Sequence, residues 1–567
     1  MKQILLISAF ISLGMIMNAQ TFQWAKHFTG DGNNNGYSLA QNSSGDLYVA
    51  GSFEGTIDFD TGEGVYTLTS FGDRDAYIEK MDANGSLIWV KQIGGPEADY
   101  IRCISLGLSD NIYITGSFKG TADMDPGDDN YNYTSLGGED MFVVELDEDG
   151  NFTWAGHMGG TLDDHITSIA VAPSGNVYIA GYYLGTADFE PADTAEYYLQ
   201  ATGQALFVEK LNQNNQFVWA KTMGGPGFDY CQSMCIDEQE NVYTTGMFAG
   251  PADFDPGEDV FYLNSVGDRD IYMSKLSNEG LFVWAKAMGG YELEAGQGIV
   301  YDSDSHLFLT GNFQGTVDFD PDTSAYYMTS MGDYDIFTGK YDIEGNLIWM
   351  KQMGGPGSDG GYAITLDNDN NVYSTGHFSE TADFDPGTGI FEMTSFGDLD
   401  IFISKLDASG NFVWAADMGG EMYDRGLAVM TDNQNNIFTT GMFEGMADFD
   451  PSDNNYYLEA VGNSDVFISK LSTELLGLTD HEQANELVVY PNPVNHYLNI
   501  VMDFNQQFTD EKMSLELIDL SGKVVIAKEV AVDQTLINLD MSRLPSGEYA
   551  LILSNSKRKQ VQKVIKN

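Results

Sequence analysis

The chain contains seven tryptophans, and each one lies 65 residues after the one before it. They are Trp24, Trp89, Trp154, Trp219, Trp284, Trp349 and Trp414. Because the register shows no net insertion or deletion over six intervals, the spacing indicates one structural unit repeated seven times. Each repeat is expected to bury its apolar face against its neighbours. The chain is therefore predicted to adopt a repeat architecture.

Within one repeat the pattern predicts four short strands, over residues 87–93, 100–106, 111–118 and 141–146. These segments are rich in β-branched and aromatic residues and are bounded by Gly, Asn and Asp. No helical period of 3.6 residues persists in any repeat. Four antiparallel strands in each of seven repeats are typical of a β-propeller, and a solenoid of 65-residue coils is the alternative.

The two ends of the repeat region favour the propeller. The first tryptophan strand, around Trp24, has no partner strands before it, and the last repeat ends at residues 465–471 without a tryptophan strand of its own. Pairing these two segments would close the ring and remove both open sheet edges. We therefore predict an all-β fold in which residues 20–471 form a seven-bladed β-propeller closed by the N-terminal strand.

Composition and the N-terminus indicate an exported protein. The net charge is −59, from 85 acidic and 26 basic residues, so nucleic acid is not an expected partner. Residues 1–19 resemble a signal peptide, with Lys2, an apolar run and Ala19 at the predicted cleavage site. No other apolar run approaches the roughly 20 residues of a membrane-spanning helix, so no transmembrane segment is predicted.

Acidic residues recur at fixed positions of the repeat. An Asp-x-Asp motif lies in the loop between the second and third strands, and a further Asp precedes the third strand. We expect these acids on one loop face, where Ca²⁺ would offset their repulsion. The candidate ligands are Asp58, Asp60, Asp75, Asp123, Asp125, Asp140, Asp253, Asp255, Asp270, Asp318, Asp320, Asp335, Asp383, Asp385, Asp400, Asp448, Asp450 and Asp465. The alternative is that Asp serves as a turn residue that binds its own backbone amides.

No catalytic constellation is found. The chain lacks the His spacing of an H-E-x-x-H zinc site, a G-x-S-x-G nucleophile elbow and a phosphate-binding G-x-x-x-x-G-K-[ST] loop. Glycoside hydrolysis requires one asymmetric carboxylate pair, which seven similar copies do not provide. We expect no enzyme activity. The competing prediction is a secreted Ca²⁺-dependent hydrolase or lyase that acts on polysaccharide or another extracellular polymer.

The chain changes character after the last repeat. Residues 472–486 are predicted to be a linker, and residues 487–567 contain short apolar strands typical of a small Ig-like β-sandwich.

Two family resemblances accompany these patterns. The repeats resemble the bacterial seven-bladed β-propeller repeat family at Gly175-Asn176-Val177-Tyr178 and at Asp400 to Leu406. The C-terminal segment resembles the type A sorting domain of the type IX secretion system found in Bacteroidetes. The matching residues include Tyr490, Pro491, Asn492, Pro493, Asp519, Gly522, Lys523, Gly547 and Tyr549. The second resemblance implies that the type IX machinery is a partner and that the product is secreted or displayed on the outer cell surface.

Together these patterns predict a secreted or cell-surface binding or adhesion protein. Its partner would be an extracellular glycan or protein that contacts the acidic loop face. Ca²⁺ is the one cofactor that the acids suggest.

Overall fold

The computed structural model describes residues 21–62, 64–192, 195–322, 324–452 and 454–472 of the repeat region. Further along, it describes residues 488–490, 494, 496–501, 512–519, 524–531, 536–545, 547–554 and 559–566. The predicted signal peptide and nearly all of the predicted linker lie outside these residues. The chain divides into two compact units, Met1–Thr473 and Glu474–Asn567. Among the described residues, no helix has the length and apolar character needed to cross a membrane.

Each repeat of the first unit forms an antiparallel series of four strand positions, here called inner, second, third and outer. The inner strands are β2 (Asn35–Gln41), β6 (Asp99–Leu106), β10 (His165–Val171), β14 (Tyr230–Ile236), β20 (Glu294–Tyr301), β24 (Gly360–Leu366) and β30 (Arg425–Thr431). The second strands are β3 (Leu47–Asp58), β7 (Ile112–Asp123), β11 (Val177–Asp188), β15 (Val242–Phe248), β21 (His306–Asp318), β25 (Val372–Phe378) and β31 (Ile437–Phe443). A 3₁₀ turn, η1 (Leu108–Asp110), is the one helical element among the described residues.

The third strands are β4 (Thr67–Met81), β8 (Asn132–Leu146), β12 (Tyr198–Leu211), β18 (Asp270–Leu276), β22 (Tyr327–Asp342), β28 (Asp400–Leu406) and β34 (Asp465–Ser472). The outer strands carry the tryptophans and are β5 (Leu87–Ile93), β9 (Phe152–Gly160), β13 (Phe217–Met223), β19 (Phe282–Met288), β23 (Leu347–Met353), β29 (Phe412–Gly420) and β1 (Thr21–Gly30). Short hairpins extend the second and third positions of three repeats: β16 (Pro251–Asp253) with β17 (Tyr262–Asn264), β26 (Thr381–Asp383) with β27 (Glu392–Thr394), and β32 (Met446–Asp448) with β33 (Tyr457–Glu459).

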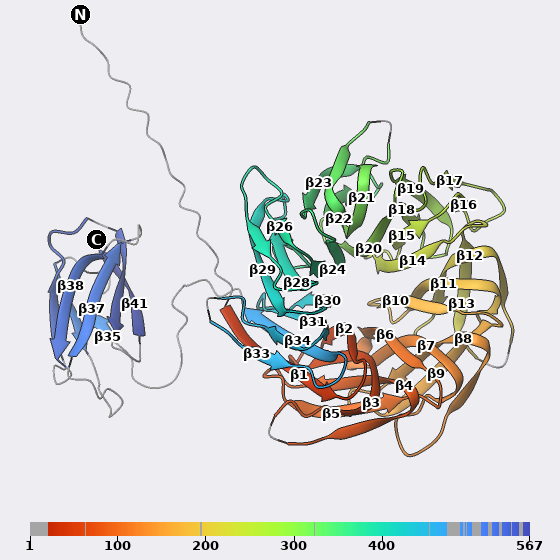
Figure 1. Ribbon diagram of the computed structural model, residues 1–567, viewed down its shortest axis with the longest axis horizontal. Coiled ribbons are helices and arrows are strands. Elements are labelled where there is room, and N and C mark those ends of the chain that lie inside the picture. Colours follow the sequence, from red (N-terminus) through yellow and green to blue (C-terminus); the bar gives the residue numbers. More distant parts are fainter. Residues whose placement is uncertain are drawn as a thin grey trace, which may run out of the picture. The chain divides into compact units, whose positions relative to one another are not determined.

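The repeats follow one another around a centre (Figure 1). Each inner strand contacts the inner strand of the next repeat, and β30 contacts β2. The N-terminal strand β1 pairs antiparallel with β34, from Thr21 opposite Ser472 to Phe28 opposite Val466. The first strand of the chain is therefore the outer strand of the last repeat.

The tryptophans lie between neighbouring repeats. The Trp24 ring lies 6.2 Å from that of Phe438. On its other side it meets Gly85, in the turn between the third and outer strands of the next repeat. A Cβ at Gly85 would lie 3.1 Å from the indole, and φ is +76° there, so glycine is required on both grounds. The repeated tryptophan thus serves packing between repeats.

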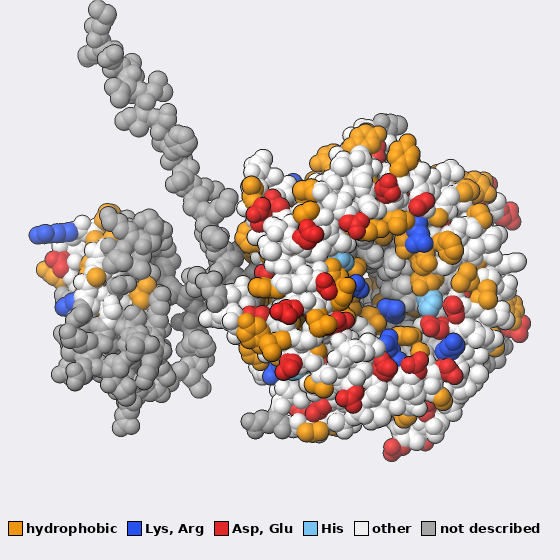
Figure 2. All heavy atoms as spheres, viewed as in Figure 1, with side chains coloured by type: hydrophobic (Ala, Val, Ile, Leu, Met, Phe, Trp, Pro, Cys, Tyr) orange, Lys and Arg blue, Asp and Glu red, His pale blue; other side chains and the backbone are white. Residues whose placement is uncertain are grey.

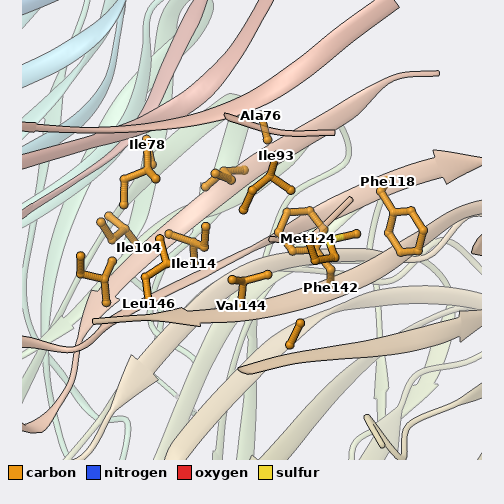
Figure 3. Close-up of a cluster of buried hydrophobic side chains, with 14 of the residues drawn as sticks. Ala76, Ile78, Ile93, Ile104, Ile114, Phe118, Met124, Phe142, Val144 and Leu146 are labelled. Carbon is orange, nitrogen blue, oxygen red and sulfur yellow. The ribbon is translucent and has the colours of Figure 1, made fainter. Parts of the chain in front are cut away.

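The apolar core also lies largely between repeats. In Figure 3, Ile78 and Ile93 from one repeat face Ile104, Val144 and Leu146 from the next. All of these side chains are buried. Such clusters stabilise each repeat through its neighbours, as expected for a repeat architecture.

The second unit contains two antiparallel sheets. One holds β35 (Val488–Tyr490), β36 (Tyr497–Val501) and β39 (Leu536–Asp540). The other has the order β38 (Val524–Ala531), β37 (Lys512–Asp519), β40 (Gly547–Ser554), β41 (Lys559–Lys566). A single buried cluster takes side chains from both sheets, among them Leu498, Ile537, Leu515 and Leu551. The two sheets therefore share one core.

Candidate functional site

The first acid of each Asp-x-Asp motif binds the backbone of its own loop. Asp58 Oδ1 accepts hydrogen bonds from the amides of Asp60, at 3.1 Å, and Tyr66, at 2.8 Å. The same two contacts recur at Asp123, Asp188, Asp253, Asp318, Asp383 and Asp448. These are the bonds of an Asx turn, which supports the alternative stated for the sequence.

The second acid makes a similar turn. Asp60 Oδ1 accepts the amide of Gly62 at 2.8 Å, and Asp125, Asp255, Asp320, Asp385 and Asp450 accept the amide two residues on. Within the described part of the chain, no group of three or more His, Cys, Asp or Glu side chains is arranged to hold a metal ion. Calcium binding at these acids stays a prediction.

The Asp-x-Asp loops begin against the preceding repeat, and their later residues are exposed. Asp123 pairs through its backbone with Gly94, at the end of the preceding outer strand, and the equivalent pair recurs in the other repeats. Thr61 in the first loop donates to the carbonyl of Gly85, in the turn at the far end of the third strand. Each loop therefore runs along the boundary between two repeats.

The residue between the two acids explains this position. Phe59, Met124, Phe189, Phe254, Phe319, Phe384 and Phe449 occupy it and are all fully buried. Burying a side chain of this size stabilises the fold by about 1.5–3 kcal/mol. Burial of this apolar residue therefore favours a loop that packs between two repeats. The structure places the first acid of each motif at the end of a strand, whereas the sequence interpretation placed it within the loop and overlooked the residue between the acids.

The acids that the sequence predicted just before the third strands lie in those strands and are buried, most of them as carboxyl pairs. Asp75 Oδ2 accepts the amide of Phe71 at 2.9 Å, and Asp99 Oδ2 accepts the amide of Gly95 at 2.6 Å. A Cβ on Gly94 would lie 2.8 Å from Asp75 Oδ1 and 2.9 Å from Asp99 Oδ2, so both carboxyls converge there. The equivalent pairs are Asp140 with Asp164, Asp270 with Glu294, Asp335 with Asp359, and Asp400 with Asp424.

Two repeats lack one carboxyl of the pair, and comparison with them shows how the second carboxyl affects the pKa of the first. Burial, followed by the charge of Asp75, raises the pKa of Asp99 to about 8. Burial raises the pKa of Asp229, whose partner position is Ala205, only to about 6. In the last repeat, Asn34 replaces one carboxyl and its Nδ2 donates to Asp465 Oδ1 at 3.3 Å. Burial together with a neighbouring carboxylate therefore raises the pKa of Asp99 and Glu294 to about 8 and those of Asp164, Asp359 and Asp424 to about 7. These predicted calcium ligands are therefore interior groups, whereas the sequence interpretation placed them on a loop face.

At the centre of the ring, the inner strands share a backbone irregularity but carry different side chains. Every inner strand has a β-bulge at the same position, where the pairing register shifts. The bulged residues are Tyr37, Arg102, Thr167, Gln232, Gln297, Tyr362 and Leu427. Bulges re-aim side chains and are frequent beside functional sites. Here the repeat keeps its backbone and varies its side chain.

Two neighbouring positions vary in the same way. One begins or nearly begins the inner strand and holds Asn35, Tyr100, His165, Tyr230, Ala295, Gly360 and Arg425. The other lies just before the buried acid of the third strand and holds Arg74, Glu139, Gln204, Arg269, Tyr334, Leu399 and Ser464. The three positions together contain every arginine of residues 21–472.

These varied side chains form a continuous cluster, which we call the arginine–tyrosine belt. It consists of Tyr37, Arg74, Tyr100, Arg102, Glu139, His165, Tyr182, Tyr230 and Arg269. The Arg102 guanidinium lies 4.5 Å from the ring centre of Tyr37 and 5.9 Å from that of Tyr100. The Tyr182 and Tyr230 rings are 4.8 Å apart, and Arg269 lies 5.7 Å from Tyr230.

The two groups of the belt adjoin each other, because the charge of Arg102 acts on both His165 and Tyr182. His165 Nδ1 lies 3.5 Å from Glu139 Oε2, and the His165 ring lies 4.9 Å from that of Tyr182. Burial holds the pKa of His165 below its ordinary value, so the ring is neutral near pH 7. In Figure 2, basic and histidine side chains gather around the centre of the face, among otherwise uncharged and acidic surface. The signal for this site was present in the sequence as the breakdown of repetition at three positions.

Comparison with known families concerns both units. Residues 488–567 match the model of the secretion system C-terminal sorting domain, and residues 348–377 match that of a β-propeller repeat. The chain carries β-propeller repeats and a type IX secretion sorting domain. It is therefore a protein directed to the outside of the cell.

The sorting domain contains the motif residues that the sequence pointed to. Tyr490, Asp519 and Gly547 lie in β35, β37 and β40, and the buried Tyr549 donates to the carbonyl of Pro545 at 2.8 Å. Pro491, Asn492, Pro493, Gly522 and Lys523 lie outside the described residues.

The relatives are distant. An uncharacterized WD repeat-containing protein of Acanthamoeba polyphaga mimivirus is 23% identical over 74% of this chain, which spans 36% of that relative's length. Dimeric latent PorU from Porphyromonas gingivalis is 9% identical over 64% of this chain and 31% of its own, with a TM-score of 0.13. A protein of unknown function from Bacteroides thetaiotaomicron is 10% identical over 80% of this chain and 98% of its own, with a TM-score of 0.24. TM-scores of this size do not establish a common fold.

Proposed function

We propose that the first unit is a closed seven-bladed β-propeller and that the second is an Ig-like sandwich. The pairing of β1 with β34 and the cycle of contacts between inner strands support the first statement. The shared core of two antiparallel sheets supports the second. An experimental structure with an unpaired edge on β34 would contradict the closed ring.

We propose further that the protein is a secreted or cell-surface binding protein whose ligand contacts the arginine–tyrosine belt. The observation that carries this proposal is the loss of repetition at the centre of the ring, while the surrounding scaffold repeats closely. A unique ligand requires a unique set of side chains, which repeated loops do not offer. The proposal moves the binding surface predicted from the acidic loops to the ring centre.

Binding is favoured over the hydrolase alternative by the way the acids are used. The Asp-x-Asp carboxylates bind backbone amides, and the remaining repeated acids form buried pairs. The Asp-x-Asp acids recur in every repeat and the other set is buried, so neither set forms the single asymmetric carboxylate pair that glycoside hydrolysis requires. We therefore propose no catalytic residue and no required cofactor.

The ligand-binding proposal is tested with full-length protein on a glycan array and in pull-downs from extracellular material. The belt variant Arg102→Gln is compared with Tyr327→Ala, a substitution of an exposed side chain where β22 begins, directly after an acidic loop. A ligand retained by Tyr327→Ala and lost by Arg102→Gln would support the proposal. A ligand retained by Arg102→Gln and lost by Tyr327→Ala would indicate that the acidic loops bind it instead.

Export is tested by deletion of residues 487–567 in the native host. We expect the truncated protein to accumulate in the periplasm and to be absent from the cell surface and medium. Undiminished secretion would refute the role of the sorting domain. Fusion of residues 1–19 to a reporter tests the proposed signal peptide in the same host.

A further inference from the structure

We infer that the arginine–tyrosine belt binds an acidic glycan, a sugar chain in which one or two residues carry carboxylate or sulfate groups. This inference rests on the binding function proposed above and adds the chemical class of the ligand. It follows from the charges, the ring contacts and the exposure of the belt residues.

The arginines of the belt differ in whether an acidic side chain neutralises them. Within the described residues, neither Arg102 nor Arg269 forms an ion pair, although the chain has a net charge of −59. Arg74 lies 3.9 Å from Glu54 and is partly neutralised. Because salt screens charges beyond about 8 Å under physiological conditions, the local guanidinium groups decide what binds. Two unneutralised arginines favour one or two anionic groups.

Aromatic rings hold the guanidinium groups of Arg102 and Arg269. Arg102 is exposed and lies over the Tyr37 ring, and Arg269 lies 5.8 Å from Phe228 and 5.7 Å from Tyr230. Ring contacts fix the plane of a guanidinium without using its N–H groups. Arg269 Nη1 donates to Met247 Sδ at 3.8 Å, a weak contact, and the other N–H groups stay available for a carboxylate or sulfate, which they can bind in bidentate fashion.

A partly exposed aromatic surface lies beside the arginines. Tyr37, Tyr100, Tyr182 and Tyr230 are partly exposed, and Phe228 is 55% exposed. Ring faces with polar tips suit ligands that present both apolar C–H faces and hydroxyl groups, as sugars do. An inorganic anion would use the arginines but leave this aromatic surface without a role.

Negative charge in the belt limits how acidic the ligand can be. Glu139 lies next to His165, and Glu54 lies next to Arg74. A polyanion such as nucleic acid would need several phosphate contacts along a basic surface, which the belt does not supply. A sugar chain with one or two acidic residues fits between these glutamates.

The experiment titrates the full-length protein with polygalacturonate, chondroitin sulfate and uncharged dextran, by calorimetry. Arg102→Gln and Arg269→Gln are the test variants, and Arg543→Gln, an exposed arginine of the second unit, is the matched control. We expect at least one acidic polymer to bind the wild type and the control. We expect each belt variant to bind it at least about tenfold more weakly, because a bidentate charged contact is lost.

The outcomes separate the ligand class from the binding function. Dextran binding as tight as that of both acidic polymers, with loss in a Tyr100→Ala variant, would overturn the acidic class and leave the belt as the binding site. Acidic-polymer binding unchanged in both arginine variants would overturn both proposals. A difference between polygalacturonate and chondroitin sulfate would identify the anionic group as carboxylate or sulfate.

Discussion

The boundary between repeats and the centre of the ring use the same 65-residue repeat in opposite ways. At the boundary, a buried Phe or Met recurs in every copy between two acids, the first of which always forms a turn. At the centre, equivalent positions hold Tyr37, Arg102, Thr167 and Gln232 in successive copies. Repetition therefore marks the parts that hold the ring together, and departure from repetition marks the part that can recognise a particular ligand.

The same contrast explains why a very acidic protein can have an arginine-rich centre. Its repeated acids accept backbone hydrogen bonds or lie in pairs, as Asp58 and the Asp75–Asp99 pair show. Charge counted over the whole chain thus describes the scaffold and not the ring centre. The following experiments test this division, from the largest expected effect to the smallest.

Removal of a buried boundary side chain should have the largest effect. We expect Phe254→Ala to lower the free energy of unfolding by about 3–5 kcal/mol, because the side chain is fully buried and its loss leaves a cavity. Phe261→Ala, in the same loop but 40% exposed, should cost less than about 1.5 kcal/mol. Urea unfolding followed by tryptophan fluorescence measures both. Equal effects would show that the loop is not held by its apolar residue.

Stability should fall as pH rises through the range in which the carboxyl pairs titrate. Burial and neighbouring charge raise the folded-state pKa of Asp99 and Glu294 to about 8 and those of Asp164, Asp359 and Asp424 to about 7. The folded state therefore binds more protons than the unfolded state between about pH 4 and 8. Stability from these groups is complete below pH 4 and lost as pH rises toward 8. Unfolding at pH 5.5 and 8 tests this, and greater stability at pH 8 would contradict it.

A single substitution isolates this effect from the repulsion of the whole acidic surface. Asp99→Asn copies the Asn34–Asp465 arrangement of the last repeat, in which an amide donates to the remaining carboxyl. We expect it to raise the free energy of unfolding by about 1–2 kcal/mol at pH 8 and by less at pH 5.5. The control is Asp229→Asn, because the position that would pair with Asp229 holds Ala205 and provides no carboxyl. A gain at Asp229 equal to that at Asp99 would argue against shared protons.

Chelation should have the smallest effect. If the Asp-x-Asp acids serve turns, EDTA should shift the melting temperature by less than about 2 °C, because a backbone amide already binds one oxygen of each carboxylate. Differential scanning calorimetry with and without added Ca²⁺ measures the shift. A large stabilisation by Ca²⁺ would restore the calcium prediction.

Much of the scaffold could be predicted from the sequence. The inner strand expected at 100–106 is Asp99–Leu106, and Trp24 does lie in a strand paired with the last repeat. Strand patterning and spacing depend on local sequence, which explains this success. The location of the acids could not be read in the same way, because burial of Phe59 between Asp58 and Asp60 is decided by contacts with another repeat.

The belt was missed for a different physical reason. Arg74 and Arg269 share one position of the repeat with five other residue types, and Arg102 stands at another position, so no position of the repeat is basic throughout. Only the ring arrangement of the inner strands brings them to one cluster. A search for positions that vary within a strict repeat would have pointed to them.

The central claim is that the boundary positions provide stability and the varied central positions provide binding. The most direct test measures melting temperature and affinity for polygalacturonate or chondroitin sulfate in two double variants. We predict that Arg102→Gln with Arg269→Gln lowers affinity at least about tenfold and changes the melting temperature by less than about 2 °C. We predict that Asp123→Ala with Asp125→Ala lowers the melting temperature and leaves affinity unchanged. The reverse assignment of the two effects would contradict the account.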